Sequence, residues 1–117
     1  MKWEVFIMMY LDFNAGANVY KLRLNTRSIV ALEKQLGCNP LAIFGDGETM
    51  PTVTTMVTVL HAALQALQHN ITMNDAYDIF DAWLEDGHAS VDFVHVILDL
   101  YKVSGIVPKD VGSDEKN

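Results

Sequence analysis

Four side chains of metal-binding type recur at helical spacing in the second half of the sequence. They are His88, Asp92, His95 and Asp99, separated by four, three and four residues. Imidazole nitrogens and carboxylate oxygens are ligands that zinc and manganese take in proteins. One straight stripe cannot surround a metal tetrahedrally, and the same residues form the polar strip of an otherwise apolar helix. We therefore expect a solvated polar strip and no metal centre.

Other patterns that support catalysis or cofactor binding are missing from the sequence. Around Gly47 and Gly87, the first and third positions of an EF-hand loop, which must supply oxygen ligands, hold only Ala, Phe or Leu. The single cysteine, Cys38, has no histidine near it in the sequence to activate the thiol. The chain contains no glycine-rich phosphate loop, no Gly-x-Ser-x-Gly and no His-Glu-x-x-His. We expect a protein that is not an enzyme and uses no cofactor.

The composition fits one compact domain in a reducing compartment. The chain has 117 residues, half of them hydrophobic, and a formal net charge of -7. A chain of this length can bury a core without disulfides or metal. One cysteine cannot form an intramolecular disulfide, which favours a reducing compartment. The acid excess argues against nucleic-acid binding, because that binding depends on Lys and Arg.

The acids are concentrated in the middle of the chain. Residues 1–34 carry a net charge of +2, whereas residues 35–101 carry nine acids and no Lys or Arg. Some of these acids must therefore face water or a partner. One interpretation is a solvated face that keeps the protein soluble. The other is a docking surface for a basic partner segment, because complementary charge favours specific association.

Neither a membrane span nor a secretion signal is predicted. Residues 49–74 carry no charge, but many Thr, Gln and His side chains interrupt the stretch. At the N-terminus, Glu4 and Asp12 lie where a secretion signal is basic or apolar. We therefore expect the first residues to form a strand.

Hydrophobic periodicity predicts an α+β fold, with a single domain over residues 1–107 and a disordered tail over 108–117. Alternation of apolar and polar residues predicts a β-hairpin over residues 7–24, with strands at 7–13 and 19–24. Spacing of three and four residues predicts a bundle of helices over about 26–36, 51–69, 73–86 and 90–104.

Terminal residues support these helix boundaries. Gly37 is placed to end the first helix, and Pro51 suits a first helical position. Thr72 and Asp75 have the spacing of a capping box, which predicts the start of the third helix. On that helix, Asp78, Asp81 and Glu85 are predicted to form an acidic ridge.

The last predicted helix is apolar on two sides. One stripe contains Val91, Val94, Leu98 and Tyr101, and the other contains Phe93, Ile97 and Leu100. Because such a helix needs two neighbours, we expect one of them to come from another molecule. The predicted partner-binding residues are the second stripe and the acidic flank, namely Phe93, Ile97, Leu100, Asp78, Asp81 and Glu85. A homo-oligomer is expected on the same grounds.

Three long stretches follow one another in a recognisable order. They are ANVYKLRLNTRSIVALEKQLGCNPLAIF, MPTVTTMVTVLHAALQALQHNITMNDAYDIFDAWLEDG and FVHVILDLYKVSGI. The order is a strand of alternating basic and apolar residues, a helix with Leu-Glu and Leu-Gly, an Asn-Pro-Leu turn, a Pro-started helix and two more helices. Over roughly residues 10–107 this resembles the tail assembly chaperones of long-tailed, siphovirus-type bacteriophages and prophages.

The resemblance implies a non-enzymatic role in tail morphogenesis. Such proteins hold the helical tape measure protein in the cytoplasm of the bacterial host and recruit tail tube subunits around it. They leave before the tail is finished, so absence from the mature virion is implied, as is self-association. Some members also have a longer form made by ribosomal frameshifting.

Two other functions remain open. A small acidic regulatory protein that binds a basic partner, or that mimics nucleic acid, would also explain the acidic middle. A metal-dependent helical enzyme is the third and most distant hypothesis, because it depends on the His88 to Asp99 stripe alone.

Overall fold

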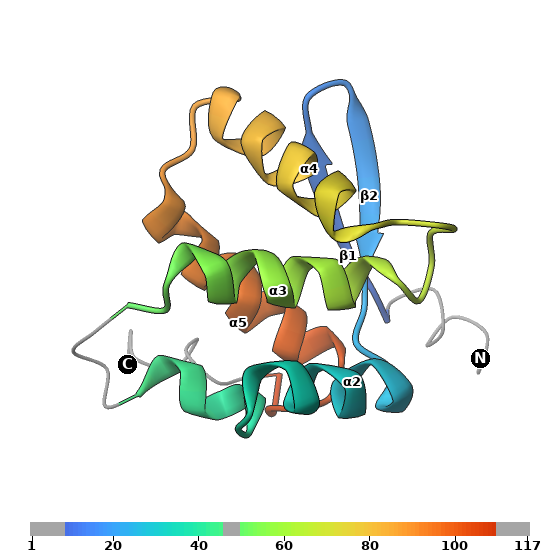
Figure 1. Ribbon diagram of the computed structural model, residues 1–117, viewed down its shortest axis with the longest axis vertical. Helices are drawn as coiled ribbons and strands as arrows, with labels where there is room; N and C mark the ends of the chain where they lie inside the picture. Colours follow the sequence, from blue (N-terminus) through green and yellow to red (C-terminus); the bar gives the residue numbers. More distant parts are fainter. Residues whose placement is uncertain (1–8, 46–49, 110–117) are drawn as a thin grey trace.

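The computed structural model describes residues 9–45 and 50–109, and these form the predicted α+β fold. An antiparallel hairpin comes first, and four α-helices follow within the described residues (Figure 1). In chain order the elements are β1 (Leu11–Ala15), β2 (Asn18–Leu22), α2 (Thr26–Leu36), the 3-10 helix η1 (Pro40–Phe44), α3 (Val53–Leu64), α4 (Met73–Glu85), the 3-10 helix η2 (Ser90–Asp92) and α5 (Phe93–Val103). Residues 7 and 8 of the predicted hairpin and residues 110–117 of the predicted tail lie outside the described residues.

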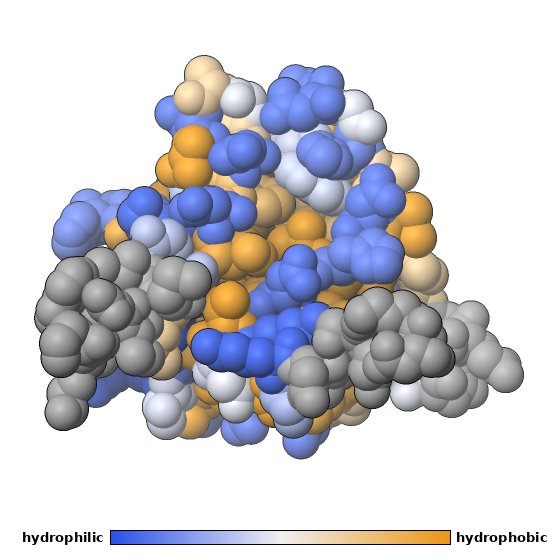
Figure 2. All heavy atoms as spheres, turned by 180° about the vertical axis from the view of Figure 1, so that it is seen from behind, coloured by the Kyte–Doolittle hydropathy of each residue, from blue (hydrophilic) through white to orange (hydrophobic). Residues whose placement is uncertain are grey.

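α3 lies at the centre of this arrangement. In Figure 1 it crosses the middle of the molecule, with α2 below it, α4 and the hairpin above it and α5 behind it. Seven of its twelve residues are buried, so the absence of charge from this helix reflects packing on several sides. No helix among the described residues is long and apolar enough to cross a bilayer. Seen from behind, the molecule shows an apolar area bordered by hydrophilic side chains (Figure 2).

The hairpin is tighter than the sequence predicted. Ala15 pairs with Asn18, which leaves only Gly16 and Ala17 in the turn. Gly16 has a φ of 63°, and a positive φ at the first turn position is typical of a two-residue hairpin turn of type II′. β2 ends at Leu22 because the next backbone N–H groups bind other elements. The N–H of Arg23 donates to the carbonyl of Ala63 at 3.1 Å.

α2 has the predicted boundaries, whereas α3 is shorter than predicted at both ends. Thr52 caps α3 by accepting the N–H of Thr55, so Pro51 precedes the helix and is not its first residue. At the other end, α3 stops at Leu64 and not near residue 69. The side-chain amide of Gln68 makes two hydrogen bonds, of 2.8 and 2.9 Å, with the backbone of Lys21. After Leu64 the chain therefore leaves the helix, and Gln68 binds β2.

α4 begins as predicted, and the last predicted helix is divided in two. Thr72 and Asp75 form the capping box of α4, with hydrogen bonds of 2.9 and 3.0 Å. The predicted helix over 90–104 starts with one 3-10 turn, η2, before α5 begins at Phe93. The Asp92 carboxylate accepts the N–H of Ala89 at 2.9 Å and so stabilises that tight first turn.

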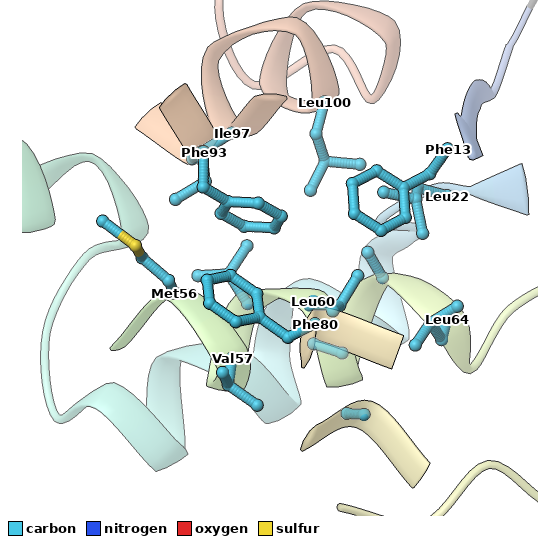
Figure 3. Close-up of a cluster of buried hydrophobic side chains, with 14 of the residues drawn as sticks. Phe13, Leu22, Met56, Val57, Leu60, Leu64, Phe80, Phe93, Ile97 and Leu100 are labelled. Atoms are coloured by element: carbon cyan, nitrogen blue, oxygen red, sulfur yellow. The ribbon is translucent and has the colours of Figure 1, made fainter. Parts of the chain in front are cut away.

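Aromatic side chains from three elements meet above α3. Phe13 of β1, Phe80 and Trp83 of α4 and Phe93 of α5 have ring centroids between 5.2 and 5.8 Å apart. Phe93 meets each of the other rings edge to face, which is a favourable aromatic geometry. Figure 3 shows these Phe rings turned toward the same space as Leu60 and Leu100. This cluster locks the hairpin, α4 and α5 together.

Candidate functional site

The outer face of α4 carries the predicted acidic ridge. Asp78, Asp81 and Glu85 are exposed, and they follow one stripe over about two helical turns, or about 10 Å. The opposite face carries the buried residues Ala76, Ile79, Phe80 and Trp83. Tyr77 lies beside the ridge and is 50% exposed, which is high for an aromatic side chain. We call Asp78, Asp81 and Glu85 the α4 ridge.

Other acids of the same region have structural roles. The carboxylates of Asp75, Asp86 and Asp92 each accept a backbone N–H at 2.8 to 2.9 Å. Asp86 accepts the N–H of Gly16 and thereby fastens the hairpin turn to the end of α4. Within the described part of the chain, the α4 ridge carboxylates accept no such hydrogen bond. The α4 ridge is therefore one part of the acidic region whose side chains are available to a partner.

The apolar half of the predicted interface lies inside the molecule. Phe93, Ile97 and Leu100 are at most 1% exposed and point into the core (Figure 3). α5 packs against α3 and β1 of its own chain, so this stripe does not need a neighbour from another molecule. On the other stripe, Tyr101 is also buried, and Val91 is 50% exposed. An interface of the folded protein must therefore use other apolar side chains.

The structure separates the four residues of the metal-type stripe. Asp92 caps η2, and His88 stacks on Trp83 with ring centroids 4.5 Å apart and planes 6° apart. His95 is exposed on α5. No three His, Cys, Asp or Glu side chains come together as metal ligands anywhere in residues 9–45 and 50–109.

Two members of that stripe nevertheless share a surface cleft. His88, Asp99 and Asp12 line one hollow of about 240 Å³, which we call the β1–α5 cleft. Its lining is completed by Leu11, Phe13, Asn14, Trp83 and Val96. Asp12 and Asp99 are 87 positions apart in the sequence, so periodicity gives no sign that they meet. The stripe recognised in the sequence lacked the acidic residue that β1 contributes to this cleft.

A second cavity lies between α2 and α3. It has a volume of about 230 Å³, and its wall contains Ala31, Ala62 and Ala66. His61 also lines it, and the Nδ1 atom of His61 is buried without a hydrogen-bond partner in the described structure. The small alanine side chains leave this space where the two helices meet. In the sequence, alanines repeated at helical spacing are only a weak signal of such a cavity.

The fold and the surface define a small α+β protein whose exposed features are an acidic ridge and an acidic cleft. The sequence of residues 12–116 matches a protein family described as a family of unknown function, DUF6096. The match spans most of the chain, and the protein belongs to this family. No curated protein and no solved structure matches the chain significantly.

Proposed function

We propose that this protein is a non-enzymatic tail assembly chaperone that binds the tape measure protein of a long-tailed phage. In this role it helps recruit tail tube subunits in the cytoplasm of the bacterial host and leaves before the virion is complete. The partner is taken from the resemblance of the sequence to tail assembly chaperones. The observation that supports a binding role is the exposed α4 ridge, in a region of 67 residues without Lys or Arg.

The α4 ridge suits a long helical partner. Its three carboxylates can face basic residues repeated at three and four positions along a partner helix. Tyr77 supplies apolar surface beside the charges, where the apolar seam of that helix can rest. Each exposed ion pair is worth only about 0.2–1 kcal/mol. One copy would therefore bind weakly, whereas copies joined in the proposed homo-oligomer would bind more tightly through avidity, and tube subunits could replace the contacts one at a time.

The proposal is tested by binding to the tape measure protein encoded in the same genome. The variant Asp78→Asn/Asp81→Asn/Glu85→Gln removes the ridge charges without changing side-chain size. Losing three exposed pairs of about 0.5 kcal/mol each predicts a dissociation constant about tenfold higher and a weaker dependence on salt. Glu33→Gln is the control, because Glu33 is an exposed acid on α2.

The results distinguish a wrong function from a wrong binding surface. If the unmodified protein does not bind the tape measure protein in titration calorimetry, the chaperone proposal is wrong. If it binds and the ridge variant binds equally well, the chaperone uses another surface. Light scattering on the same samples tests the proposed homo-oligomer.

Two further measurements address the alternative of a small acidic regulator. If the protein mimicked nucleic acid, DNA would compete with it for its basic target. The coding DNA around the last codons offers a second test. A slippery heptamer with an open -1 frame, followed by a very long coiled-coil reading frame, is expected for the chaperone and not for the regulator.

A further inference from the structure

We infer that the β1–α5 cleft is an anchor site for one arginine side chain of a basic protein partner. The cleft brings together Asp12 from β1, His88 from the loop after α4 and Asp99 from α5. At about 240 Å³ it has room for a side chain and is too small for a helix. The inference relies on the proposed function only for the identity of the partner.

Charge selects a cationic occupant. Asp12 and Asp99 line the cleft, and the lining contains no Lys or Arg. Both acids are exposed. Lys21 is opposite Asp12 across the hairpin, but its ammonium group lies over the Tyr10 ring, 4.9 Å from the ring centre. The negative potential in the cleft is therefore available to a cation from another molecule.

The apolar and aromatic lining favours arginine among cations. The exposed His88 ring lies flat on Trp83 and offers a planar surface on which a guanidinium group can stack. Partly buried Leu11 and Val96 can contact the methylene stem of the same side chain. A carboxylate binds a guanidinium in a two-pronged geometry that an ammonium group cannot form. In the described residues no cluster of three ligands competes for the cleft as a metal site.

The cleft and the α4 ridge are separate surfaces. The ridge follows the outward face of α4, whereas the cleft is lined by β1 and α5 together with Trp83 and His88, and it contains none of the three ridge residues. A basic partner that reaches both would be anchored by one arginine in the cleft and held by several charges on the ridge. This arrangement would fix the register of the partner, which a ridge of exposed charges cannot do alone.

The anchor site can be tested without any protein partner. The probe is N-acetyl-arginine amide, titrated into the ¹⁵N-labelled full chain and followed by two-dimensional NMR. We expect saturable shifts of the Trp83 indole and of amides in β1 and around Asp99, with a dissociation constant of millimolar order. N-acetyl-citrulline amide has nearly the same shape without the charge, and it should cause no saturable shift.

Variants locate the probe. Asp12→Asn and Asp99→Asn should each weaken arginine binding about two- to fivefold, because each removes an exposed charged acceptor. Asp78→Asn is the matched control on the α4 ridge and should bind as the unmodified protein does. His88→Ala should weaken the arginine probe and have little effect on N-acetyl-lysine amide, because only arginine stacks.

Several results would overturn the anchor site. They are equal shifts with citrulline, shifts that never saturate, or binding that is unchanged by both Asp12→Asn and Asp99→Asn. These outcomes leave the chaperone proposal standing if the tape measure protein still binds. Conversely, if the protein bound arginine but did not bind the tape measure protein, the anchor site would be supported and the chaperone proposal would be wrong.

Discussion

The hydroxyl of Tyr101 offers a sharp test of how the core is held together. Tyr101 is fully buried, and its hydroxyl donates to the carbonyl of Pro40 at 2.9 Å across 61 positions of sequence. This bond connects α5 to η1, and Phe44 meets the same ring edge to face. Tyr101→Phe keeps the ring and removes the donor. The buried carbonyl then loses its partner, and we expect the free energy of unfolding to fall by about 1–2 kcal/mol at neutral pH.

The same variant should change how stability depends on pH. Burial first, and then an electrostatic contribution from Cys38, raises the pKa of Tyr101 well above its ordinary value. Above about pH 10 the unfolded chain releases this proton while the folded chain keeps it, so stability falls as pH rises. Because of this one proton, the free energy of unfolding falls by about 1.4 kcal/mol per pH unit, and Tyr101→Phe does not show this loss. The stability advantage of the unmodified protein should therefore be about 1.4 kcal/mol smaller at pH 11 than at pH 8.

Urea unfolding of both proteins across this pH range measures the two effects together. The other tyrosines are present in both proteins, so the difference between the two isolates Tyr101. If the difference stayed constant up to about pH 11, the Tyr101 proton would not be held by the fold in the way we describe. If Tyr101→Phe were as stable as the unmodified protein at neutral pH, the bond to Pro40 would contribute nothing.

Two further substitutions test the packing of α4 and α5. Phe93→Ala should lower the free energy of chemical unfolding by about 3–5 kcal/mol, because Phe93 fills the centre of the aromatic cluster. A loss below about 1 kcal/mol would place this side chain outside the core. Thr72→Ala removes the acceptor for the N–H of Asp75 and should lower the free energy of thermal unfolding by about 1 kcal/mol. Thr54→Ala is the control, because Thr54 lies on the exposed side of α3, and it should have a smaller effect. Equal losses would contradict the capping role of Thr72.

Local sequence signals predicted most of the secondary structure, and they were wrong where distant residues took part. The α2 boundaries and the start of α4 follow from caps that lie within three residues of the helix. The end of α3 does not follow from local signals, because the apolar pattern continues to Leu67. There the side chain of Gln68 forms hydrogen bonds with the backbone of Lys21. Likewise β2 ends where Arg23 meets Ala63, a contact between elements 40 positions apart.

The candidate sites divide in the same way. The α4 ridge was predictable because its three acids belong to one helix whose opposite face is apolar. The partner role of Phe93, Ile97 and Leu100 was inferred from surplus apolar surface, but periodicity cannot say whether the neighbour of a helix belongs to its own chain. Here α3 and β1 supply that neighbour, and the stripe is core. The β1–α5 cleft could not be foreseen, because no single element carries more than part of it.

By itself, the sequence determined the α+β class, the hairpin followed by helices, the caps of α2 and α4 and the acidic middle of the chain. Each of these depends on residues within one or two turns of each other, where spacing and side-chain type decide the outcome. Only the tertiary structure decided which apolar faces meet and which carboxylates stay exposed. It placed Asp12 and Asp99 on the wall of one cleft and buried Phe93, because both outcomes depend on how α3 orients its neighbours in space.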